Sequence, residues 1–370
     1  LPGEPRTISG PEVAALSDEE LADVAVERNI FGRMKPDDKA RVIAALQSKG
    51  RYVAMVGNGV NDVSALKRAQ VGISLQSGSN ASRGVSDMVL IDDSFGALPK
   101  AIIEGKRTVS GLRNILKLYL TRNFTLVVLF AVLFVFLGFI PMKPIQNTFY
   151  AFVSVSVIVF FMTLFAKPDD NKGPILPGVL RFVIPASIVT GVFGLLVYGA
   201  TYMLVDNGTL VIDLEHMADV AGKSVENMLH DLSWSGSPFE EVCARSAMVL
   251  FVTMVGVLNL FLVCPRWKFL SYDGSVNRSV IPLALAALMI GLVSAMYLYF
   301  PVIAVNLVGL VIFPGWFFGV LAVMTVVTFF VILGILKTNI LSPLTEITER
   351  HYQNMLAKEY SGEKFGLRRR

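Results

Sequence analysis

The residues most able to support chemistry lie in one short glycine-rich loop, residues 57–62 (G-N-G-V-N-D). Gly57 and Gly59 allow the backbone to approach a phosphate group closely, and the Asp62 carboxylate can hold a cation or orient the phosphate. A tight turn followed by an N-capped helix uses the same residue types. Taken alone, the loop therefore predicts either a phosphate site or an ordinary turn.

The elements around the loop decide where it would lie. Residues 52–56 (Y-V-A-M-V) predict a buried strand of a parallel sheet, and residues 63–69 predict the helix that follows the loop. Ligands of doubly wound sheets bind where strands end and loops begin. The loop 57–62 is thus expected at the ligand-binding edge of a sheet.

Further motifs occur on both sides of the loop, in a fixed order. They are F-G-R-M-K-P-D-D-K at 31–39, a helical run at 42–46, V-G-I-S-L at 71–75, S-G-S at 77–79, D-M-V-L-I-D-D-S-F at 87–95 and E-G-K-R at 104–107. Together they resemble the phosphorylation domain of P-type ATPases, in which the loop usually reads G-D-G-V-N-D-x-x-A-L. The resemblance is greatest to bacterial cation-transporting pumps related to the calcium-type ones. It covers about residues 10–125, and the later segments agree only in number and spacing.

This resemblance implies a role for each loop residue. Lys39 would stabilise the charge of an acyl phosphate, Asn61 would hydrogen-bond to the phosphate, and Asp62 would support a Mg²⁺ site. The complete pump would use ATP and Mg²⁺, and neither is expected to bind tightly to this chain alone. Without this context, Lys39 is an ordinary solvated helix lysine.

The chain also departs from the family pattern. The phosphorylated-aspartate motif D-K-T-G-T does not occur in it, and Asn58 stands where the family has a Mg²⁺-binding aspartate. An amide keeps an oxygen ligand but loses a negative charge, which weakens divalent-cation binding. Two hypotheses follow. The chain is the C-terminal part of an ATP-driven cation pump, whose N-terminal half is cut away or is a separate polypeptide; alternatively, it is a non-enzymatic membrane remnant or accessory protein.

Composition indicates a membrane protein. Hydrophobic residues make up 54% of the chain and charged residues 17%, below the roughly 25% of soluble domains. A membrane-spanning helix needs about 20 apolar residues. Six such spans are predicted, at about 118–140, 148–166, 180–204, 245–264, 280–300 and 315–336, whereas the apolar stretch 301–314 is expected to be a peripheral connection.

The distribution of charged residues predicts on which side of the membrane each loop lies. Segment 206–242 contains eight acidic residues and one base, Lys223, whereas Lys and Arg concentrate in the other loops and in the tail 337–370. The positive-inside rule then predicts an extracytoplasmic 206–242 and a multi-pass plasma-membrane protein with both termini cytoplasmic. No basic, aromatic-interleaved face is visible, so a nucleic-acid partner is not expected.

The expected fold is a partial phosphatase-superfamily (HAD-like) α/β domain at 1–113, followed by an all-α bundle of six helices within 114–336. The expected partners are the bilayer and a cation. The predicted spans are nearly free of ionisable groups, and Asn123, Ser154 and Ser156 are the candidates for an ion pathway. Serines in membrane helices also bond to their own backbone or help helices to pack. The sequence does not identify the cation.

Overall fold

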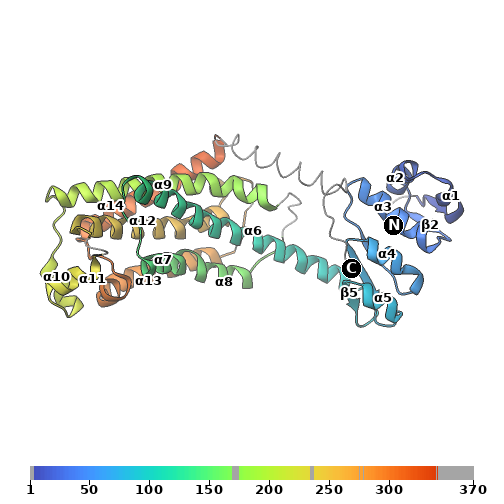
Figure 1. Cartoon of the computed structure of the whole chain (residues 1–370), viewed down its shortest axis with the longest axis horizontal. Helices are drawn as coiled ribbons and strands as arrows, with labels where there is room; N and C mark the ends of the chain where they lie inside the picture. Colours follow the sequence, from blue (N-terminus) through green and yellow to red (C-terminus); the bar gives the residue numbers. More distant parts are fainter. Residues whose placement is uncertain are drawn as a thin grey trace. The chain divides into compact units, whose positions relative to one another are not determined.

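The computed structural model describes residues 4–168, 175–233, 237–274, 276–277, 279–338 and 340. These residues form two compact units, one up to Ile103 and one from Glu104 (Figure 1). The tail predicted at 337–370 lies almost entirely outside the described residues. Each unit is considered separately below.

The first unit contains two small parallel sheets. β1 (Thr7–Ser9) pairs with β2 (Ile30–Gly32), and a second sheet has the order β3-β4-β5. Its strands are β3 (Ala54–Val56), β4 (Val71–Leu75) and β5 (Met88–Leu90), in a register that places Ala54 opposite Val71 and Ile73 opposite Met88. Parallel neighbours require crossover connections. Here these contain η1 (Val60–Asp62), α4 (Val63–Arg68) and α5 (Asn80–Val85).

Three further helices complete this unit: α1 (Gly10–Ala15), α2 (Asp18–Glu27) and α3 (Pro36–Ser48). Ser17 and Glu20 form a capping box that starts α2, and Pro36 occupies the first position of α3, where its missing N–H costs nothing. Leu21 of α2 and Val42 of α3 share a small apolar core with Val13. That core fixes the start of α3, where Lys39 lies.

The second unit is a helical bundle with six helices long and apolar enough to span a membrane, as the sequence predicts. The membrane helices and their short extensions are α6 (Ala97–Phe130) with η2 (Ala131–Phe136), α7 (Pro144–Ala151) with η3 (Phe152–Ser156) and α8 (Val157–Leu164), α9 (Ile175–Asp206), α12 (Phe239–Val263), α13 (Ile281–Tyr299) and α14 (Gly315–Thr338). α6 is one continuous helix from Ala97 to Phe130.

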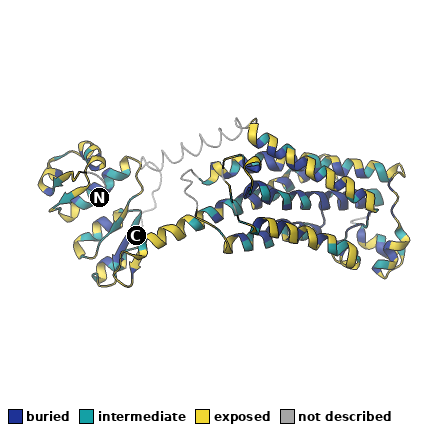
Figure 2. Ribbon diagram, turned by 180° about the vertical axis from the view of Figure 1, so that it is seen from behind, coloured by how far each residue is buried: buried dark blue, intermediate teal, exposed yellow. Residues whose placement is uncertain are grey.

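The bundle is organised around α12. In the most apolar part of this helix, 78% of the residues are buried. The helix packs against α9, α13 and α14. Buried residues concentrate in the interior of the bundle and exposed ones on its outside (Figure 2). Many of the exposed side chains are large and apolar, such as Val127, Leu196 and Val323. An outer surface of this kind is suited to lipid.

Three features of the bundle differ from the sequence-based expectations. The spans are not nearly free of ionisable groups, because Arg122 lies within α6 and Arg245, with no exposed surface, within α12. Residues 301–314 contain η5 (Ile303–Val308) and pack into the core. The Gly309 carbonyl accepts a hydrogen bond from the Gln146 side chain, and the Val311 amide donates to the Ser246 hydroxyl. Segment 206–242 contains two helices, α10 (Leu214–Ala221) and α11 (Val225–Leu232), whose apolar faces are buried.

Candidate functional site

An ion pair joins Lys39 to Asp62. The Lys39 Nζ donates to Asp62 Oδ1 over 2.7 Å, and the two side chains are 34% and 13% exposed. Lys39 lies in the first turn of α3, and Asp62 lies at the end of η1, beyond the carboxyl end of β3. Two of the three residues assigned catalytic roles by resemblance are therefore in direct contact.

The loop that carries Asp62 is closed by its own carboxylate. Asp62 Oδ2 accepts hydrogen bonds from the amides of Asn58 at 3.2 Å and Gly59 at 3.1 Å. A Cβ at Gly57 would lie 2.6 Å from the Asp62 Cβ, so only glycine fits there. The backbone therefore turns closely around one carboxylate, which is the geometry expected of a loop that presents its amides to an anion.

The protonation state of Asp62 follows from these contacts. Partial burial by itself raises the pKa of the carboxyl, but the hydrogen bonds from Lys39, Gly59 and Asn58 and the charge of Lys39 outweigh it and lower the pKa below the ordinary aspartate value. Asp62 is therefore ionised at neutral pH and is available as a fixed negative charge.

The two asparagines of the loop lie at its surface. Asn58 and Asn61 are exposed, and within the described part of the chain their side chains form no hydrogen bonds. Both amides are thus free to turn toward a ligand. Asn61, the third residue assigned a catalytic role, is in the loop but not in the Lys39–Asp62 contact.

A cluster of serines, whose role the sequence analysis did not predict, supports the loop through hydrogen bonds to the backbone of Asn58. The carbonyl oxygen of Asn58 accepts from the Ser79 amide at 2.9 Å and from the Ser82 hydroxyl at 3.0 Å. Ser79 also caps α5 by accepting from the Ser82 amide. The S-G-S run before a helix was the available signal, because serine is a preferred N-cap residue.

A second carboxylate lies at the same edge of the sheet. Asp93 follows β5, has a left-handed φ of 51°, and accepts from the Ser77 amide at 3.0 Å. That hydrogen bond and a second one from Ser77 lower the pKa of the Asp93 carboxyl. Because β3, β4 and β5 are parallel, Asp62 and Asp93 both lie beyond the carboxyl ends of strands. Asp93, however, accepts its hydrogen bond from Ser77 and so holds the loop that follows β4 rather than the 57–62 loop.

The loop offers Mg²⁺ a partial set of ligands. Mg²⁺ is usually held by one or two carboxylates together with water and substrate phosphates. Asp62 supplies one carboxylate and Asn58 a neutral amide oxygen. No group of three or more His, Cys, Asp or Glu side chains suited to a metal occurs among the described residues. The residues fit a metal shared with a phosphate but not a closed protein cage.

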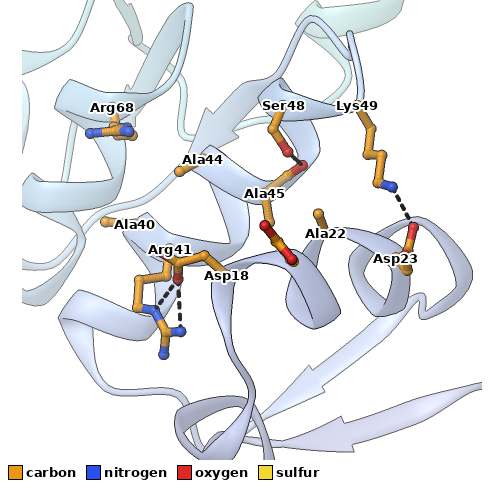
Figure 3. Close-up of a pocket in the computed structure, with 11 residues that line it drawn as sticks. Asp18, Ala22, Asp23, Ala40, Arg41, Ala44, Ala45, Ser48, Lys49 and Arg68 are labelled. Carbon is orange, nitrogen blue, oxygen red and sulfur yellow. Dashed lines mark hydrogen bonds and ion pairs between the residues drawn. The ribbon is translucent and has the colours of Figure 1, made fainter. Parts of the chain in front are cut away.

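A hollow of about 640 Å³ between α2 and α3 is separate from this site. It is lined by alanines and by two ion pairs, Arg41–Asp18 and Lys49–Asp23 (Figure 3). Neither Lys39 nor Asp62 lines it. Lys49 is therefore a matched control for Lys39, since both are lysines of the α3 region paired with an aspartate.

The ion-pathway candidates are dispersed in the bundle. Ser154 and Ser156, in the π-helical segment η3, donate to the backbone oxygens of Tyr150 and Ala151, and Asn123 accepts from Arg122. Of these three, only Ser154 lines a very small cavity, of about 10 Å³. Arg122, Thr125 and Asn259 are among the other polar residues that line it, and each has a buried polar atom that forms no hydrogen bond with the described residues. The sequence signal for Arg122 was its charge within an apolar run.

Comparison with known proteins agrees with the motifs. No family model matches the chain. A calcium-transporting ATPase, CtpE, of Mycolicibacterium smegmatis is 34% identical over 195 residues, which is 50% of this chain and 24% of the relative. A probable cation-transporting ATPase I of Mycobacterium tuberculosis is 35% identical over 47% of this chain and 11% of its own length. The magnesium-transporting ATPase, P-type 1, of Escherichia coli is 27% identical over 277 residues, 69% of this chain and 29% of its own length.

These relatives confirm the resemblance found in the motifs. The chain spans less than a third of the length of each of these three relatives. Within its described residues, this chain has six candidate membrane spans and small parallel sheets. The homologues of this chain are P-type cation-transporting ATPases.

Proposed function

We propose that this chain is the C-terminal portion of an ATP-driven cation pump, and that it supplies the groups that hold a phosphoryl group while the pump is phosphorylated on an aspartate elsewhere. The observation that carries the proposal is the Lys39–Asp62 pair at the end of β3. Phosphoryl transfer depends mainly on positioning and on stabilising charge. A fixed lysine beside a glycine-rich loop provides both.

Each loop residue has a defined task in this proposal. The Lys39 ammonium stabilises the charge of the phosphoryl oxygens, and Asp62 keeps that ammonium oriented. The exposed amide of Asn61 donates to the phosphate. Mg²⁺, when bound near Asp62 and Asn58, neutralises further phosphoryl charge.

The nucleophile must come from outside the 370 residues. Within the described strands, β3 pairs with β4 on one side, and nothing pairs with its other edge. A strand ending in the phosphorylated aspartate fits beside β3, where its carboxyl end would point to Lys39. The same partner would bring the rest of a HAD-like domain, of which β3, β4 and β5 are one part.

The transported species is a cation in this proposal. Two of the relatives carry calcium and magnesium in their names, so these two ions are the first to test. The experiment is to co-express this chain with the N-terminal portion of CtpE and to measure ion-stimulated ATP hydrolysis in membranes. Lys39→Gln should abolish the stimulated turnover, and Lys49→Gln should preserve it.

The alternative is an inactive remnant or accessory protein that keeps the fold without the chemistry. In that case no ion stimulates turnover in the co-expressed pair, and Lys39→Gln changes nothing. Equal turnover in the Lys39→Gln and Lys49→Gln variants would therefore favour this alternative.

A further inference from the structure

A large groove opens in the second unit where several membrane helices end together. Its volume is about 730 Å³, and it lies between α6, the end of α8, the end of α12 and the start of α13. Since α8 ends at Leu164, α12 ends at Val263 and α13 begins at Ile281, the groove is at one boundary of the apolar bundle. Its size is in the range of pockets that hold organic ligands.

The groove is basic. Arg113 and Lys117 project from successive turns of α6 and are only 8% and 5% exposed, and Lys167 follows α8 at the surface. Asp273 is the one acidic residue among the described lining residues. Burying basic groups is costly, so their convergence on a cavity favours an anionic occupant and disfavours the transported cation.

Aromatic rings fix one of these bases. The Lys117 Nζ lies 5.4 Å from the ring centroid of Tyr272 and 5.9 Å from that of Phe182. Such cation–π contacts hold the ammonium in one place. A base whose position is set before a ligand arrives loses less conformational entropy when the ligand binds.

The walls of the groove combine hydrogen-bonding and apolar surfaces. Ser110, Asn114 and Asn277 contribute hydroxyl and amide groups, while Met162, Phe165 and Ile281 contribute apolar surface. Phe165 follows the last residue of α8 and is 53% exposed. One ligand therefore meets charge, hydrogen bonds and hydrocarbon in the same cavity.

We propose that this groove binds the phosphate of an anionic phospholipid headgroup, with the glycerol and upper acyl chains against Met162, Phe165 and Ile281. Basic pockets between membrane helices at the bilayer surface bind such headgroups. Free phosphate shares the anionic chemistry, but it would leave the apolar wall and most of the cavity unused. A lipid uses all three kinds of surface.

Native mass spectrometry of the full chain, stripped of lipid in detergent, tests the proposal. Phosphatidylglycerol should bind in preference to the zwitterionic phosphatidylcholine. The double variant Arg113→Gln/Lys117→Gln should weaken that binding by about fivefold for each base removed. The matched control is Lys268→Gln, because Lys268 is an exposed base beyond the same end of α12 that does not line the groove; it should bind the lipid unchanged.

Two further measurements distinguish lipid binding from misfolding of the double variant and from binding of free phosphate. Lys167→Glu changes an exposed side chain, so it tests the groove even if the buried double variant fails to fold, and it should also weaken phosphatidylglycerol by at least about fivefold. Inorganic phosphate is the competitor. Displacement of the lipid by comparable concentrations of phosphate would assign the site to the free anion and overturn the lipid assignment. Equal binding of the two lipids, or unchanged binding in Lys167→Glu, would overturn the proposal as a whole.

Discussion

The Lys39 ammonium lies 2.7 Å from the Asp62 carboxylate, although the two residues are 23 positions apart in the sequence. The pair brings the first turn of α3 to the loop after β3. One carboxylate thereby holds both the lysine and the backbone amides of Asn58 and Gly59. The expectations for catalysis depend on this arrangement.

The first prediction concerns the pH dependence of the loop. Because the pKa of Asp62 is lowered in the folded state, the stability that its ionised form contributes is fully present above the unfolded aspartate pKa of about 3.9 and is lost as pH falls through the lowered value. Hydrogen–deuterium exchange of the Asn58 and Gly59 amides, corrected for the intrinsic rate at each pH, should show protection at neutral pH that disappears in acid. In Asp62→Asn, protection should be weaker at neutral pH and should not titrate. If the protection of these amides is still lost in acid in Asp62→Asn, a group other than Asp62 is responsible for the pH dependence.

The second prediction concerns Asn58. In the co-expressed pair, Asn58→Asp should lower the Mg²⁺ concentration for half-maximal phosphorylation by roughly tenfold, because a carboxylate adds a charge to a site that has one. Asn80→Asp, which adds the same charge on α5, is the control and should leave the Mg²⁺ dependence unchanged. An unchanged Mg²⁺ dependence in Asn58→Asp would place the metal elsewhere.

Topology provides the third prediction. Thr209 and Lys268 are exposed in segments predicted to face opposite sides of the membrane. In a background of Cys243→Ala and Cys264→Ala, Thr209→Cys should react with an impermeant maleimide in intact cells, and Lys268→Cys should react only after permeabilisation. The reverse pattern would invert the proposed orientation.

The fourth prediction concerns the buried charges of α12. Arg245 Nη1 lies 3.5 Å from Glu241 Oε1, and both side chains are buried. Removing one partner leaves an uncompensated buried charge, which costs about 3–5 kcal/mol. Arg245→Met should therefore lower the thermal stability of the detergent-solubilised chain strongly, and adding Glu241→Gln should restore part of it. A double variant less stable than either single variant would show that the two residues act separately.

The features that could be predicted from the sequence are those set by local composition. About 20 apolar residues suffice to predict a membrane helix, so all six spans were found. The strand at 52–56 and the helix after the loop follow from local pattern and turn residues, and the structure has them as Ala54–Val56 and Val63–Arg68. The prediction that this strand is buried was wrong, because Ala54 is exposed and Met55 and Val56 are only partly buried.

Features that depend on packing between distant segments could not be predicted in the same way. Residue patterns alone do not show that Lys39 meets Asp62. The family resemblance assigned Lys39 to a phosphate and Asp62 to a Mg²⁺ site, but it did not predict their direct contact. The support of Asn58 by Ser82 crosses 24 residues. Arg245 was expected near the end of a span, yet the bundle buries it beside Glu241, because neighbouring helices cover that face of α12.

The central claim is that this chain holds a phosphoryl group but does not accept it, and labelling with radioactive ATP tests this most directly. The purified chain alone should form no hydroxylamine-sensitive phosphoprotein. When it is co-expressed with the N-terminal portion of CtpE, label should appear on that partner only, and Lys39→Gln should remove it while Lys49→Gln retains it. Hydroxylamine-sensitive label on the 370-residue chain itself would contradict the account.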